Sequence, residues 1–74
     1  MNAIILYRTD DGKRMHRYYR MDVLNLCGEW CFMREWGRIG SNGRMRSVPF
    51  ATLQEVYAAL DKQRKAKERR GYSV

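Results

Sequence analysis

The chain has 74 residues, 45% of them hydrophobic, and 15 Lys/Arg against 8 Asp/Glu give it a net charge of +7. This length provides one domain with a small core and excludes a multidomain enzyme. The longest apolar run near the N-terminus, residues 3–7, is too short for a membrane span or a signal-peptide core, so we expect neither membrane insertion nor secretion by a cleaved signal.

Strand-forming residues alternate in the first two thirds of the chain and predict four strands, at residues 4–8, 18–26, 30–36 and 44–50. Turn-forming residues separate these strands, at residues 10–12, 25–28 and 41–43. The Asn42-Gly43 pair is typical of a tight hairpin. Pro49 removes a backbone donor, which indicates that the fourth strand lies at an edge or ends there.

The hydrophobic period changes from two residues to between three and four after Phe50. Thr52 and Glu55 have the spacing of a capping box, in which each side chain bonds a backbone N–H at the start of a helix. An apolar stripe at helical spacing then faces a core, formed by Leu53, Val56, Tyr57 and Leu60. Cationic residues follow, and Gly71 is a suitable end for the helix. We therefore predict an α+β domain: an antiparallel sheet of four to five strands with one long C-terminal helix packed on one face.

The positive charge is dominated by arginine, which supplies 11 of the 15 cations. The planar guanidinium binds phosphate oxygens through two parallel hydrogen bonds, so this bias favours nucleic acid as the partner. A basic surface that is only solvated, and a membrane-surface role, are the alternatives. No segment pairs a cationic face with a long apolar one, so we expect no membrane partner.

Metal binding and catalysis have few residues to use. Cys27 and Cys31 either face each other on a hairpin or serve as small apolar residues, and only His16 is available to join them in a zinc site. We therefore expect reduced thiols in a cytoplasmic protein, nucleoid-associated if bacterial, with no metal and no cofactor. One histidine and no nucleophile motif predict a protein that is not an enzyme and has no small-molecule substrate.

The segment Trp36-Gly37-Arg38-Ile39-Gly40 resembles the motif that names the WGR domain, a module of poly(ADP-ribose) polymerases and of small bacterial proteins. Two further blocks match in order. His16-Arg17-Tyr18-Tyr19 is similar to the family's Asn-Lys-aromatic-Tyr strand opening, and Arg69-Arg70-Gly71-Tyr72 is similar to its closing Lys-Lys-Gly-Tyr. The resemblance covers residues 3–73 and implies a small stand-alone module without the ADP-ribosyl transferase region.

The resemblance implies binding of duplex DNA at strand ends, breaks or nicks, through sugar and phosphate contacts without strong sequence preference. In the family the motif Trp packs on the terminal sugar, the motif Arg contacts the backbone, and the strand-opening Asn and the closing Tyr hold the 5′ end. These roles fall on Trp36, Arg38 and Tyr72, with His16 in the place of the Asn; a histidine still donates to phosphate. The alternative is a protein-interaction module that docks a partner in a DNA repair or regulatory complex.

The same residues indicate a binding site without reference to the family. Gly37 lacks a Cβ, which lets the backbone turn and approach a ligand and leaves Trp36 at the rim of the sheet, whereas Trp30 is assigned to the core. An indole beside an arginine offers a stacking surface and a phosphate donor together. Arg44 and Arg46 flank a hairpin and either contact phosphate or are only solvated. The candidate DNA-binding residues are Trp36, Gly37, Arg38, Tyr72, His16, Arg17, Arg44 and Arg70.

Overall fold

Four strands form one antiparallel sheet in the computed structural model, which describes residues 3–74 apart from the side chain of Asp11. The strands are β1 (Ile4–Asp10), β2 (Met15–Leu26), β3 (Glu29–Arg38) and β4 (Arg44–Phe50). Their order in the sheet is β1-β2-β3-β4, so each strand pairs with its neighbour along the chain. The last strand has its predicted bounds, and the other three extend beyond theirs.

The turns between the strands are located by residues with positive φ, and these are not the residues of the Asn-Gly dipeptide. Cys27 and Gly28 both have positive φ, 52° and 86°, which gives the β2–β3 turn the twist of a two-residue hairpin. The predicted tight hairpin at Asn42-Gly43 is wrong, because five residues separate β3 from β4 and the positive φ falls on Gly40. The cause is that Gly43 lies directly against β3, as described below.

The helix α1 (Leu53–Arg69) begins as predicted. Thr52 Oγ1 accepts a hydrogen bond from the backbone N–H of Glu55 at 3.2 Å, the forward half of the capping box. Val56 and Leu60 are buried against the sheet, at 0% and 8% exposure. Tyr57 is 49% exposed, so its predicted place on the core-facing stripe is wrong. It lies one residue beyond Val56, about 100° around the helix and away from the face that meets the sheet.

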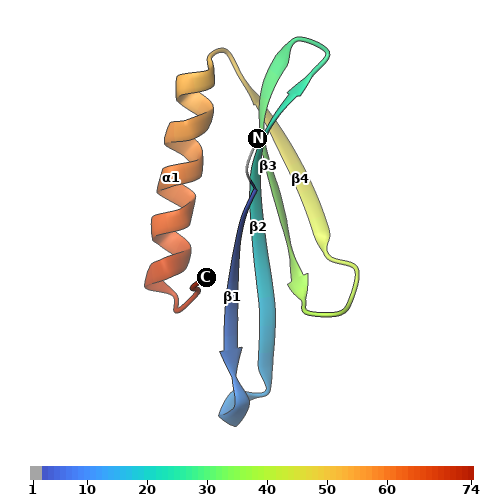
Figure 1. The fold of residues 1–74 in the computed structure, drawn as a ribbon, viewed down its shortest axis with the longest axis vertical. Coiled ribbons are helices and arrows are strands. Elements are labelled where there is room, and N and C mark those ends of the chain that lie inside the picture. Colours follow the sequence, from blue (N-terminus) through green and yellow to red (C-terminus); the bar gives the residue numbers. More distant parts are fainter. Residues whose placement is uncertain (1–2) are drawn as a thin grey trace.

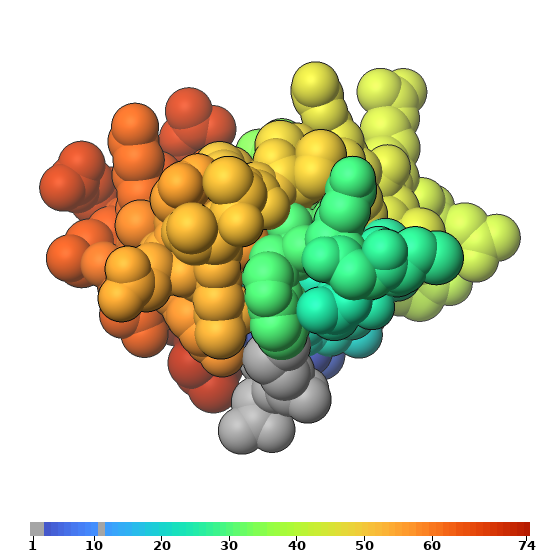
Figure 2. Space-filling model, turned by 90° about the horizontal axis from the view of Figure 1, so that it is seen from above, coloured from blue at the N-terminus to red at the C-terminus, as the bar shows by residue number. Residues whose placement is uncertain are grey.

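The sheet and the helix form two layers with the core between them (Figure 1). In Figure 2, seen along the strands, the helix in orange fills one side and the strands in green and yellow fill the other. The buried cluster between the layers comprises Leu6, Tyr19, Met21, Val23, Phe32, Val56 and Leu60. Trp30, which the sequence assigns to the core, is half-buried and packs against this cluster. No helix within residues 3–74 has both the length and the apolar character needed to cross a membrane.

The chain after the helix turns back onto the edge of the sheet. Gly71, with φ 96°, reverses the chain, and the backbone N–H of Tyr72 donates to the carbonyl of Lys67 at 3.1 Å. Ser73 and Tyr7 then exchange two backbone hydrogen bonds, of 2.7 and 2.8 Å, in an antiparallel bridge on β1. The tail is therefore anchored to the sheet, and the helix ends at Arg69, two residues before the predicted stop at Gly71.

Candidate nucleic-acid interface

Three arginines lie side by side across the helix-facing side of the sheet. Arg8 on β1 is directly opposite Arg17 on β2, which is directly opposite Arg38 on β3. We call these three residues the arginine row. Like charges directly opposite each other destabilise a sheet, so this arrangement has a cost that core packing does not explain.

An aromatic row lies two residues further along the strands. Tyr19 is directly opposite Trp36, and their rings stack with centroids 6.1 Å apart and planes 19° from parallel. Tyr72 from the tail approaches Tyr19 edge-on at 6.2 Å. Tyr19 is buried, whereas Trp36 and Tyr72 are half-buried and pack against the core cluster. The core therefore holds Trp36 in place and still leaves part of its surface open.

A second arginine pair lies on the other side of the aromatic row. Arg34 on β3 is directly opposite Arg46 on β4. The Arg34 guanidinium lies over two rings, with its Cζ 5.9 Å from the centroid of Phe32 and 6.0 Å from that of Trp36. The aromatic row is thus flanked by arginines on both sides.

The helix adds two polar residues to the site. They lie on the same face as its apolar stripe, because they continue the spacing of three and four residues. After Leu60, the residues in step are Gln63 and Lys67. The side-chain amide of Gln63 donates to Tyr19 Oη at 3.1 Å, and Lys67 Nζ lies 4.4 Å from the centroid of the Tyr19 ring. Burial, together with the nearby charges of Arg70 and Arg34, lowers the pKa of Lys67 below its usual value.

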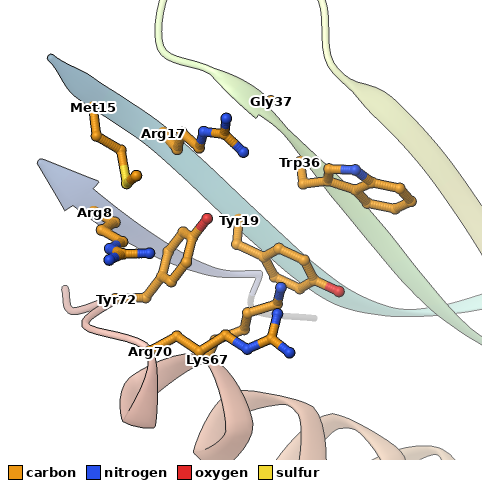
Figure 3. A pocket seen from close by; sticks show the side chains of 9 residues that line it. All are labelled: Arg8, Met15, Arg17, Tyr19, Trp36, Gly37, Lys67, Arg70 and Tyr72. Atoms are coloured by element: carbon orange, nitrogen blue, oxygen red, sulfur yellow. The ribbon is translucent and has the colours of Figure 1, made fainter. Parts of the chain in front are cut away.

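Two adjacent cavities open between the sheet, the helix and the tail. The first has a volume of about 190 Å³, and its lining comes from all three (Figure 3): Arg8, Met15, Arg17, Tyr19, Trp36, Gly37, Lys67, Arg70 and Tyr72. The second has a volume of about 280 Å³ and is lined by Tyr19, Arg34, Trp36, Arg46, Gln63 and Lys67. Of the described residues that line either cavity, none is acidic.

The acidic side chains near the middle of the sheet lie on its other face. Tyr18 Oη donates to Glu35 Oε2 at 2.8 Å, which raises the pKa of the Tyr18 hydroxyl. Arg20 pairs with both Asp22 and Glu35, at 3.4 and 3.5 Å. The sheet therefore has an unbalanced positive field on the helix side and a locally neutralised charge on the other side.

Five of the eight candidate residues line the first cavity: Arg17, Trp36, Gly37, Arg70 and Tyr72. Arg38 and Arg44 are exposed next to it, since Arg38 is opposite Arg17 and Arg44 is opposite Trp36. His16 is exposed, and the alternation along β2 places it on the other face of the sheet from Arg17. The structure thus brings seven of the candidates to one surface and separates His16 from them.

Sequence reasoning missed most of the supporting residues: Arg8, Met15, Tyr19, Lys67, Arg34 and Gln63. Arg46, for which the sequence leaves phosphate contact and solvation open, lines the second cavity. The pattern contains a signal for some of the missed residues. Continuing the helical stripe past Leu60 selects Gln63 and Lys67, and the alternation of β3 already places Arg34 on the face of Trp36. The position of Arg8 depends on how β1 pairs with β2, which the sequence does not state.

Comparison with known proteins identifies one family. The model of the WGR domain family matches residues 2–74. A protein of Sinorhizobium fredii (strain NBRC 101917 / NGR234), named y4dW and without a described function, is 36% identical over 66 residues; the match covers 88% of this chain and 32% of that protein. The chain thus spans about a third of the length of the curated relative that it matches. No solved structure matches significantly. WGR domains are nucleic-acid-binding modules, a binding class of domain rather than a catalytic one.

Proposed function

The chain belongs to the WGR domain family, and from this premise we propose that it binds duplex DNA at strand ends or nicks. The observation that carries the proposal is the lining of the first cavity. Trp36 and Tyr72 provide flat apolar surfaces there. Four cations surround them: Arg8, Arg17, Lys67 and Arg70. None of the described residues that line this cavity is acidic. This combination fits a sugar or base with a phosphate attached.

The shape of the cavity favours an end over the interior of a duplex. The first cavity is enclosed by the sheet, the C-terminal turn of α1 and the tail, and Figure 3 shows side chains converging on it from all three. A continuous duplex presents a broad surface in which each sugar is flanked on both sides. A strand terminus presents one sugar and one phosphate that are small enough to enter.

The chemistry of the lining favours backbone recognition over base readout. Arginine forks match phosphate oxygens, and contacts to phosphate and sugar carry no sequence information directly. We assign Arg8, Arg17 and Arg70 to the terminal phosphate and Trp36 to the terminal sugar or base. Arg38 and Arg44, exposed next to the cavity, are assigned to the flanking duplex backbone, and His16 on the other face is assigned no contact.

Competition between linear and closed circular DNA tests this function. Labelled blunt duplex is bound at 50 mM salt, and either linear or closed circular DNA of equal mass is added as competitor. End recognition predicts that linear fragments compete better, in proportion to their number of ends. Equal competition by both forms indicates plain backbone binding, and no binding of any duplex contradicts the proposal.

A second candidate function is the docking of a protein partner, and the other face of the sheet favours it. Ile5, Tyr7 and Met45 are exposed there, beside the neutralised Arg20 and Glu35. Salt dependence separates the two functions. Three to five phosphate contacts predict a log–log slope of roughly −3 to −4.5 for duplex DNA. A protein partner on the neutral face predicts a much flatter response.

A further inference from the structure

We propose that the second cavity is a separate phosphate subsite, so that the interface holds one terminal nucleotide by the two phosphates on either side of it. The first cavity takes the phosphate at the strand end, Trp36 takes the nucleoside, and the second cavity takes the phosphodiester that leads to the next nucleotide. This inference rests on the proposed binding of strand ends and specifies its minimal ligand.

The first observation is the placement of Arg34 and Arg46. They are directly opposite each other on β3 and β4, an arrangement of like charges that weakens the sheet unless an anion lies between them. Arg34 Nε is buried, and it has no hydrogen-bond partner among the described residues. A buried donor without a partner is costly, so hydrogen bonds within the described part of the chain do not explain the position of this guanidinium.

The second observation is that Arg34 is held in position before any ligand arrives. Its guanidinium lies over the rings of Phe32 and Trp36, with its Cζ about 6 Å from each centroid. Stacking on aromatic faces restricts a long side chain, so less conformational entropy is lost when it binds phosphate. A merely solvated arginine on a strand has no such restraint.

The third observation is that Lys67 lies between the two cavities and lines both. Its pKa is lowered by burial and by a cation from each side, Arg70 next to the first cavity and Arg34 next to the second. None of the described residues that line either cavity is acidic, so nothing in the lining offsets this repulsion. Anions in either cavity relieve it, so one lysine serves both phosphates.

The arginines on either side of Trp36 indicate the kind of ligand that the two cavities would hold. Arg38 in the arginine row and Arg34 in the second pair are four residues apart on β3, about 13 Å at the rise of an antiparallel strand. Trp36 lies midway between them. Arg8 and Arg17 line the first cavity, Arg34 and Arg46 line the second, and Trp36 lines both, so the ligand that we propose has an anion on each side of a flat or sugar-sized neutral centre. A nucleotide residue within a strand has this pattern.

Neutral backbone linkages test the subsite. Methylphosphonate, which has no negative charge, replaces one linkage of a blunt duplex. Three duplexes are compared: one with the replacement at the first linkage from a 5′ end, one at the first linkage from a 3′ end, and one in the middle of the duplex. Fluorescence anisotropy then measures the affinity of the wild-type protein and of the Arg34→Gln, Arg46→Gln double variant. Lys62→Gln, which removes an exposed charge from α1, is the matched control.

We expect one end-proximal methylphosphonate to weaken wild-type binding about tenfold, as loss of a charge-assisted contact requires, and the mid-duplex one to weaken it less than twofold. The double variant should bind the unmodified duplex about tenfold more weakly and should respond less than twofold to the end-proximal change. Lys62→Gln should behave as wild type. Equal sensitivity in the double variant and the wild type would overturn the inference, as would a wild type that is indifferent to both end-proximal linkages.

The two proposals fail in different ways. A protein that binds no duplex contradicts the proposed function itself, whereas a protein that binds ends normally but ignores the first linkage contradicts only the subsite. Circular dichroism melting verifies that each variant is folded. If the double variant melts early, Arg46→Gln alone provides the test, because Arg46 is exposed and its truncation leaves the packing of Phe32 and Trp36 intact.

Discussion

Gly37 and Gly43 lie against each other where the loop after β3 returns to the sheet, so closely that a Cβ on Gly37 would be 2.9 Å from the Cα of Gly43. The sequence suggests that Gly37 lets the backbone turn or approach a ligand. In the structure Gly37 lies within β3, and its missing side chain makes room for Gly43. The glycine between Trp36 and Arg38 thus serves the fold of the site.

Gly43→Ala should destabilise the domain. A Cβ at this position collides with the Trp36 carbonyl and with the Tyr18 hydroxyl, and the backbone has to shift because the carbonyl cannot rotate away. We expect a loss of about 1–3 kcal/mol, the usual range for overpacking, measured as a lower melting temperature by circular dichroism. Gly12→Ala is the control, since the nearest atom to its Cβ among the described residues beyond its chain neighbours is Asp10 Oδ1, at 3.4 Å. An unchanged melting temperature in Gly43→Ala would mean that the loop adapts freely.

Leu60→Ala should cost about 2–4 kcal/mol, because Leu60 is buried between the helix and the sheet. In a domain of this size that loss is a large part of the total stability. Tyr57→Ala truncates a half-exposed side chain on the same helix and should cost less than half as much. Urea denaturation of both variants measures the difference. Equal losses would contradict the rotation of the helix described above.

Trp36→Ala should weaken binding to linear duplex by about 1–3 kcal/mol, the usual value of an aromatic platform. Binding to closed circular DNA should hardly change, because no terminus is present to contact the indole. Trp36 also packs against the core, so Trp36→Leu, which keeps apolar bulk, accompanies it. A folded Trp36 variant that retains full affinity for linear DNA would contradict the end-contact role.

Arg38→Ala should weaken binding to both linear and closed circular DNA. Arg38 is exposed at the end of the arginine row and does not line the first cavity, so we expect it to contact the backbone of the flanking duplex. Loss of one phosphate contact should reduce the magnitude of the log–log salt slope by about one. Anisotropy titrations at several salt concentrations measure the slope. An unaltered slope would remove Arg38 from the interface.

Lys67→Met should raise stability while it weakens DNA binding. The folded-state pKa of Lys67 is lowered, so the unfolded state binds more protons, and the charged form destabilises the fold. Wild-type stability should therefore rise relative to Lys67→Met as the pH increases toward the usual lysine pKa. Melting temperatures between pH 8 and about 10 test this, with exposed Lys62→Met as the control. If the melting temperatures of wild type and Lys67→Met changed in parallel with pH, the charged form of Lys67 would not destabilise the fold, and this prediction would be contradicted.

Local pattern was sufficient for most of the fold. The alternation of β3 and the capping box of α1 depend on near neighbours, and the structure confirms the sheet and the start of the helix there. The errors have a different origin. The local sequence indicates a turn at Gly43, whereas in the structure Gly43 packs against β3. Tyr57 and Leu60 both fit the helical spacing of the apolar stripe, but their angles around the helix leave Tyr57 exposed and Leu60 buried.

The candidate site was predictable only in part, for the same reason. Trp36 and Tyr72 are 36 positions apart, so only a family motif or a structure can assign them to the same site. The arginine row exists because of strand register, and a shift of one residue would move Arg17 to the other face. Register depends on how all the strands pair, and the sequence does not state it. Composition therefore indicates a nucleic-acid partner but does not indicate which arginines lie on one surface.

The bridge between Ser73 and Tyr7 also covers part of the edge of the sheet. β1 is an edge strand, and an uncovered edge is a template on which another chain can pair and aggregate. The tail that covers this edge at Tyr7 also carries Tyr72 into the first cavity. A ligand that binds only when Tyr72 is docked stabilises the docked tail by mass action. We therefore expect a ligand in the first cavity to favour the covered edge, so that the same two hydrogen bonds connect the proposed binding with the protection of the edge strand.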